Sequence, residues 1–167
     1  MKTLLILRHA KAVPKDPSLL DHDRPLDELG KDDALRIGKL IKDKDIIPSY
    51  IISSTALRAK TTAEIVAKGC GYQGDIVLDQ SLYEAKPKDY LGILETLSDR
   101  YSGVLIVGHN PVIEGTIQML TDSSDALPIP SCALADLSLP IEKWSDFSSN
   151  SNIEQNKVVL REIIQPR

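Results

Sequence analysis

The chain has 167 residues, of which 42% are hydrophobic and 26% charged, values typical of one globular domain. Its net charge of −4 at pH 7 argues against a nucleic-acid-binding protein, because such proteins need a basic surface. No apolar run approaches the ~20 residues of a membrane-spanning helix, and no signal peptide is apparent. We therefore expect a single domain over residues 1–167 with a cytoplasmic location. Cys70 and Cys132 lie far apart and predict neither a zinc site nor a disulfide framework.

Strand and helix patterns alternate from the start of the chain. A continuous apolar run over residues 3–7 predicts a strand that is buried on both faces. Residues 12–27 are rich in Pro and Asp, which predicts a loop. Apolar residues at helical spacing then predict helices over residues 29–42 and 56–68, with a short strand at residues 50–53 between them.

The second half of the chain continues this alternation. We expect a strand at 76–78, a helix at 89–99, a strand at 104–107, a helix at 112–120, and late strands at 133–139 and 157–164. The polar residues 145–156 predict a mobile hairpin loop between the late strands. The order of elements predicts an α/β fold, a three-layer α/β/α sandwich with a mostly parallel central sheet, whose last two strands pair antiparallel at an edge.

Two of the three histidines follow predicted buried strands directly. Arg8 and His9 come after the strand at residues 3–7, and His109 and Asn110 come after the strand at 104–107. Arg58 opens the helix that follows another strand. Because ligands of open α/β sheets bind outside the carboxyl ends of the strands, these side chains are expected to converge.

The converging residue types suit a phosphoryl group. Guanidinium groups bind phosphate oxygens in bidentate fashion, and helix N-termini add backbone donors. An imidazole can attack phosphorus, and a second one can stabilise the charge of the transferring group. Each residue alone is more often structural, but four of them at equivalent strand ends predict a phosphate pocket. The arginines would repel a cation, so we expect no metal and no cofactor.

Residues 7–11, Leu-Arg-His-Ala-Lys, resemble the RHG/RHA signature of the histidine phosphatase superfamily. Residues 23–26, 53–64 and 107–111 follow in the order typical of its SixA-type phosphohistidine phosphatases (branch 1). The resemblance runs from about residue 1 to 139. It implies a phosphoglycerate-mutase-like fold without the additional segments that the larger members insert over the active site.

The resemblance also implies roles for individual residues. Arg8 and Arg58 would hold the phosphoryl group, His9 would be the nucleophile, and His109 would be the second histidine of the pocket. The superfamily often carries a Leu-x-Glu acid after the third strand, which residues 82–84 match. Glu84 is therefore the candidate general acid, although a solvated loop carboxylate is an equally good interpretation.

Three more polar residues are candidates for the pocket. Asn110 is expected to contact substrate beside His109. His22 either orders its loop or lines the pocket mouth and contacts substrate there. Asp23 either orients a pocket arginine or caps the following turn.

The sequence thus predicts a metal-independent phosphatase that forms a phosphohistidine intermediate. The favoured substrate is phosphohistidine on a signalling protein, such as a histidine-containing phosphotransfer domain, because its leaving nitrogen protonates readily. One alternative is a phosphomonoesterase for a small phosphorylated metabolite, such as a sugar or nucleotide phosphate. Another is a non-catalytic phosphate-binding signalling module. A mutase is less favoured, because no inserted segment would shield the intermediate from water.

Overall fold

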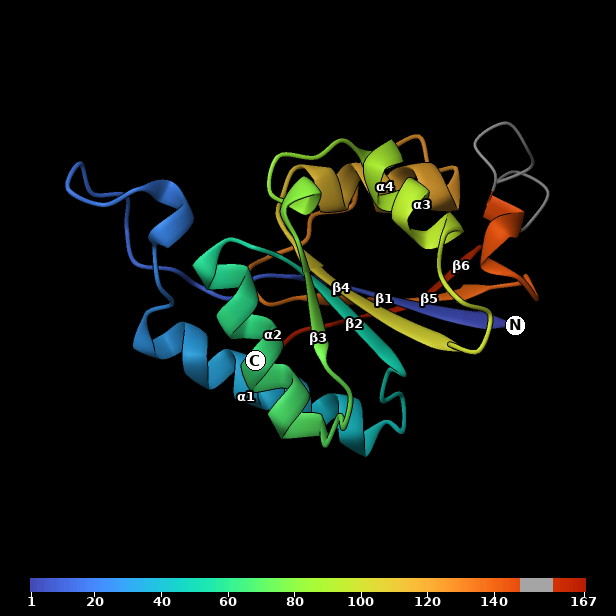
Figure 1. Cartoon of the computed structure of the whole chain (residues 1–167), viewed down its shortest axis with the longest axis horizontal. Coiled ribbons are helices and arrows are strands. Elements are labelled where there is room, and N and C mark those ends of the chain that lie inside the picture. Colours follow the sequence, from blue (N-terminus) through green and yellow to red (C-terminus); the bar gives the residue numbers. More distant parts are fainter. Residues whose placement is uncertain (148–157) are drawn as a thin grey trace.

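A computed structural model describes residues 1–147 and 158–167 and places a six-stranded sheet at the centre of the molecule (Figure 1). The strands are β1 (Lys2–Arg8), β2 (Tyr50–Ser54), β3 (Ile76–Asp79), β4 (Gly103–Gly108), β5 (Leu134–Leu139) and β6 (Val159–Ile164). The α-helices of the described residues are α1 (Glu28–Asp43), α2 (Leu57–Cys70), α3 (Pro87–Glu95) and α4 (Val112–Thr121). Short 3-10 turns lie at η1 (Asp21–Asp23), η2 (Gln80–Leu82) and η3 (Trp144–Phe147).

The sheet has the strand order β3-β2-β4-β1-β5-β6 and is mostly parallel, as predicted. β1 to β4 run in the same direction, whereas β5 is antiparallel to both of its neighbours. The predicted antiparallel pairing of the last two strands is therefore confirmed. The apolar runs at Leu4–Leu7 and Val104–Val107 are almost completely buried, because β1 and β4 pair in the middle of the sheet.

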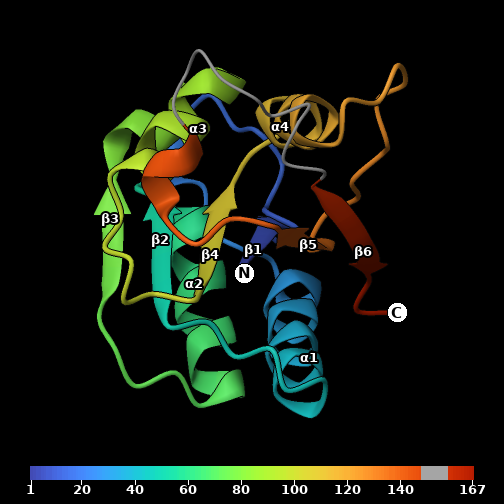
Figure 2. The ribbon, with the colours of Figure 1, turned by 90° about the vertical axis from the view of Figure 1, so that its right-hand side faces the viewer.

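Helices cover both faces of the sheet and give the three expected layers (Figure 2). α1 and α2 pack on the face to which Leu5 and Leu7 point, and α3, α4 and η3 pack on the face of Leu4 and Ile6. α1 and α2 approach closely at Gly38, where a Cβ atom would lie 2.8 Å from the Val66 carbonyl oxygen. None of the described helices is long and apolar enough to cross a bilayer.

Several predicted boundaries are shifted by one or two residues, and two differ by more. α3 ends at Glu95 rather than at residue 99, and the Thr96 hydroxyl donates a hydrogen bond to the Ile93 carbonyl (2.8 Å) in the turn that follows. The predicted hairpin loop at 145–156 is wrong at its start, because residues 145–147 belong to η3. Trp144 and Phe147 anchor this turn in the core. The remainder of that predicted loop lies outside the described residues.

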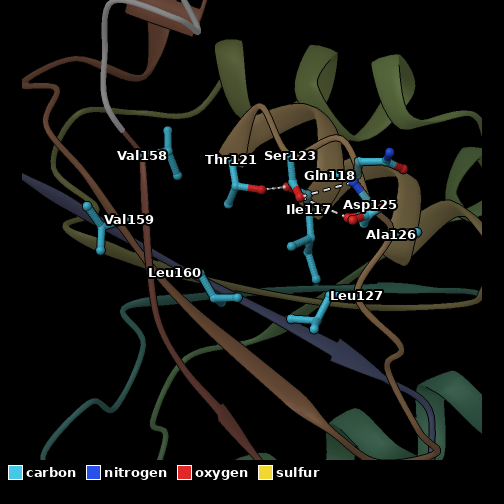
Figure 3. A pocket seen from close by; sticks show the side chains of 10 residues that line it. All are labelled: Ile117, Gln118, Thr121, Ser123, Asp125, Ala126, Leu127, Val158, Val159 and Leu160. Atoms are coloured by element: carbon cyan, nitrogen blue, oxygen red, sulfur yellow. Dashed lines mark hydrogen bonds between the residues drawn. The ribbon is translucent and has the colours of Figure 1, made fainter.

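A largely apolar pocket of about 500 Å³ lies between the end of α4 and the start of β6 (Figure 3). Ile117, Leu127 and Leu160 point into it, and Asp125 is its single charged lining residue. None of the residues predicted to carry chemistry lines this pocket, so the candidate active site lies elsewhere.

Candidate active site

A second cavity, of about 530 Å³, lies at the carboxyl ends of β1 and β4. Its lining is Arg8, His9, Lys11, Ala12, Lys15, Asp21, Arg24, Arg58, Tyr83, Glu84, His109, Asn110 and Ser131. The structure thus brings together six of the seven residues predicted for the site. Five cationic side chains face two carboxylates and two histidines, so the cavity favours an anion.

His9 is held with one ring nitrogen available to the cavity. Its Nδ1 lies 2.7 Å from the Ala10 carbonyl oxygen, which can only accept, so Nδ1 carries the proton and Nε2 the lone pair. The His9 backbone N–H donates to the Gly108 carbonyl (3.0 Å), which ties the residue to the end of β4. Burial lowers the pKa of His9 to about 4, assisted by Arg58 and Arg8. At neutral pH the ring is therefore an uncharged potential nucleophile.

His109 lies beside His9, with 5.2 Å between the two ring centroids. Its Nε2 is 2.8 Å from the Ser54 hydroxyl at the end of β2, so the two strand ends fix its ring. Burial, together with the adjacent His9 and Arg58, lowers the pKa of His109 to about 3. His109 is therefore uncharged at neutral pH, and an anion bound beside it would favour its protonated form.

Arg58 is only 6% exposed, and hydrogen bonds to the loop after β1 hold its guanidinium group in place. Its Nη1 donates to the Asp21 carbonyl (2.8 Å) and its Nη2 to the Asp21 carboxylate (3.1 Å). The Tyr83 hydroxyl donates to the same carboxylate (2.6 Å), and Arg24 donates to its other oxygen (3.0 Å). The Tyr83 hydrogen bond, with the charge of Arg58, holds the pKa of the Asp21 carboxyl well below its usual range. Asp21 is therefore a permanent anchor for two arginines.

Arg8 is held by the backbone carbonyl of Ile129, in the loop between α4 and β5. Arg8 Nη1 and Asn110 Nδ2 both donate to the Ile129 carbonyl, at 3.1 Å and 2.9 Å. The Glu114 carboxylate in α4 accepts from Asn110 Nδ2 (2.9 Å) and from the Ile129 backbone N–H (2.9 Å). Glu114 thus clamps the loop between α4 and β5 onto the two residues Arg8 and Asn110.

Two of the predicted site residues, Glu84 and His22, take no part in the hydrogen bonds that hold the other five. Glu84 is exposed and lines the cavity, and none of the hydrogen bonds or ion pairs among the described residues involves it. His22 is not part of the lining. Its Nε2 lies 2.9 Å from the Thr55 hydroxyl and its ring packs edge-on against Tyr83, at 4.8 Å between centroids. His22 therefore supports Tyr83 at the edge of the cavity.

Sequence reasoning missed several residues of the site, chiefly Asp21, Arg24, Tyr83 and Glu114. Asp21 rather than Asp23 binds the pocket arginine, and Asp23 is exposed, 3.8 Å from His22 Nδ1. The Asp-x-x-Arg spacing of residues 21–24 and the four-residue spacing of Asn110 and Glu114 were available signals. Among the described residues, no three His, Cys, Asp or Glu side chains are grouped as a metal site would need.

Comparison with known proteins places this site in a family. Residues 4–101 match the model of the histidine phosphatase superfamily (branch 1), a range that includes Arg8, His9, Arg58 and Glu84. An uncharacterised chloroplastic protein of Arabidopsis thaliana is 30% identical over 142 residues, which is 80% of this chain. The aligned part spans 65% of that plant protein, so the chain covers slightly less than two thirds of this relative.

Solved structures agree with the family match. The crystal structure of an Agrobacterium tumefaciens protein assigned as phosphohistidine phosphatase SixA is 29% identical, with a TM-score of 0.82 and 99% of both chains covered. A protein histidine phosphatase SixA complexed with tungstate shares the fold, with a TM-score of 0.81, 19% identity, and 98% and 97% of the two chains covered. The chain belongs to branch 1 of the histidine phosphatase superfamily and is of the SixA type.

Proposed function

We propose that the chain removes the phosphoryl group from phosphohistidine on a protein, through a covalent intermediate on His9. The observation that carries this proposal is the hydrogen bond from His9 Nδ1 to the Ala10 carbonyl (2.7 Å). It leaves the Nε2 lone pair for attack, in a cavity whose cationic lining includes Arg8, Arg24 and Arg58. The SixA neighbours support the choice of a phosphohistidine substrate.

In the first step, His9 Nε2 attacks phosphorus, a new P–N bond forms, and the P–N bond to the substrate imidazole breaks. The departing ring takes its proton from solvent or from a group in the cavity. In the second step, water attacks phosphorus, the P–N bond to His9 breaks, one proton of the water passes to solvent, and hydrogen phosphate and neutral His9 are released. Arg8 and Arg58 bind the equatorial oxygens throughout, and protonated His109 adds positive charge beside them.

Glu84 favours a second candidate activity at the same site, because it places a carboxyl group on the cavity lining. A phosphate ester leaves as an alkoxide and needs a proton donor, which Glu84 could supply for a small phosphorylated metabolite. The same nucleophile and arginines would serve both substrates. The leaving group separates the two proposals.

The test combines trapping of the intermediate with a comparison of substrates. Brief reaction with a phosphotransfer domain carrying ³²P-phosphohistidine should label the wild-type chain with acid-labile phosphate, and His9→Ala should carry no label. The values of kcat/KM for this protein should exceed those for sugar and nucleotide phosphates. Turnover by His9→Ala above a few per cent of wild type would contradict the covalent mechanism, and a preference for metabolites would favour the second candidate.

A further inference from the structure

The segment between β1 and α1 forms one wall of the catalytic cavity and has a fixed shape. Arg24 Nη1 donates to the Val13 carbonyl (2.8 Å), and the Val13 N–H donates to the Pro25 carbonyl (3.0 Å). Near the tip, the Ser18 N–H donates to the Asp16 carboxylate (2.9 Å). Figure 1 shows this segment in blue, projecting beyond the edge of the sheet where β1 ends. The segment therefore presents a defined surface beside the site.

A second, smaller hollow of about 370 Å³ lies along this segment. It is lined by Lys15, Asp16, Pro17, Leu19, Asp21 and Arg24. Lys15, Asp21 and Arg24 also line the catalytic cavity, so the two hollows are adjacent and share these side chains as a common wall. The rest of a molecule whose phosphoryl group is bound at His9 could therefore extend past these side chains into the second hollow.

The chemistry of the second hollow differs from that of the catalytic cavity. Pro17 and Leu19 are its two apolar lining residues, the other four are charged, and the adjacent Leu20 is 74% exposed. Lys15 at its edge is exposed and makes no ion pair within residues 1–147 and 158–167. Apolar residues with a charged rim are the composition of a protein-binding surface, whereas a small molecule is held in a concave pocket that buries most of its surface.

We propose that residues 15–20 are a docking surface for the polypeptide that carries the phosphohistidine. This inference rests on the function proposed above. An apolar side chain of the substrate packs on Leu19 and Leu20, and an acidic side chain faces Lys15. Small phosphorylated molecules occupy the catalytic cavity alone. Selection for a protein substrate therefore resides in the segment after β1 and not in the catalytic residues.

The test uses two single variants, Leu19→Asp and Leu20→Asp, with Met119→Asp as the matched control. Met119 is 44% exposed on α4 and lines neither hollow. Each protein is assayed with a phosphotransfer domain phosphorylated on histidine and with para-nitrophenyl phosphate. We expect the two leucine variants to lose about tenfold or more in kcat/KM on the phosphoprotein, mainly through a higher KM, as for truncated interface anchors. Their activity on para-nitrophenyl phosphate should stay within about twofold of wild type, a threshold equal to roughly 0.4 kcal/mol.

Each outcome decides between distinct conclusions. Equal losses on both substrates would mean that the leucines support the catalytic cavity or the fold, and would overturn the docking surface. Unchanged turnover of the phosphoprotein by both leucine variants would overturn it as well. If the wild-type protein hydrolyses small esters but does not dephosphorylate the phosphoprotein, the proposed substrate is wrong, and the docking surface is overturned with it.

Discussion

At the scale of single residues, the candidate site pairs a neutral histidine, the proposed nucleophile, with fixed cations. The Ala10 carbonyl selects the His9 tautomer, and burial keeps the ring uncharged. Arg58 is held through two hydrogen bonds to Asp21, so its charge is positioned before any ligand arrives. Preorganised charge of this kind lowers the barrier because little reorganisation is needed during the reaction.

Glu84 separates the two candidate activities at the same scale. If Glu84 is the general acid, Glu84→Gln should slow hydrolysis of an alkyl phosphate by ~10²–10⁴-fold, because the alkoxide must be protonated as it departs. Phosphohistidine should lose far less, since its leaving nitrogen takes a proton from solvent, and para-nitrophenyl phosphate should barely change. The measurement is kcat/KM on the three substrates. Equal losses on all three would assign Glu84 to binding or folding, and no loss on any would make it a bystander.

At the scale of elements, the end of β1 and the start of α4 are coupled through one loop. Ile129 lies between Pro128 and Pro130, and the two prolines have no N–H to donate. Its own N–H binds Glu114, and its carbonyl binds Arg8 and Asn110. The backbone N–H and carbonyl of this single residue therefore carry the hydrogen bonds that fix the loop against the site.

Loss of the Glu114 clamp should weaken phosphate binding without removing a cavity residue. Glu114→Ala leaves the Ile129 N–H and one N–H of the Asn110 amide without an acceptor, a loss of up to ~1–3 kcal/mol for each of these part-buried donors. We expect at least tenfold weaker inhibition by vanadate and a lower Tm. Glu114→Gln keeps an acceptor oxygen and should recover most of the vanadate affinity. Glu64→Ala, an exposed residue on α2, is the control. Vanadate inhibition unchanged in Glu114→Ala would show that the clamp does not position Arg8.

At the scale of the whole molecule, two buried neutral histidines make folding sensitive to acid. The pKa values of His9 and His109 fall to about 4 and about 3, against an ordinary value of 6.5. Below pH 6.5 the unfolded chain binds protons at these positions and the folded chain does not. The free energy of unfolding therefore falls as the pH drops from 6.5 towards 4.

The size of this effect can be measured by urea unfolding at pH 7.5, 6.0 and 5.0. Each histidine should contribute at most about 1.4 kcal/mol per pH unit once the pH is well below 6.5. His109→Gln removes one of the two groups, so its stability should fall about half as steeply over this range. Identical slopes for the variant and the wild type would show that His109 is not buried in its neutral form.

The sequence by itself determined the central strands and the place where the candidate site residues meet. The continuous apolar runs before Arg8 and His109 predicted strands buried on both faces, and they are adjacent in the middle of the sheet. The carboxyl ends of parallel strands meet at one edge, so the convergence of His9, His109 and Arg58 followed from the order of elements alone. These features depend on local spacing, which a sequence displays directly.

Only the tertiary structure decided how those residues are held. Asp21 meets Arg58 and Tyr83 across separations of 37 and 62 positions, and Arg8 meets Ile129 across 121. The short turn at Asp21–Asp23 directs Asp21 rather than Asp23 towards Arg58, a choice that composition does not reveal. Partners of a buried charge are selected by folding, because only the packed chain shows which polar groups must satisfy one another away from water.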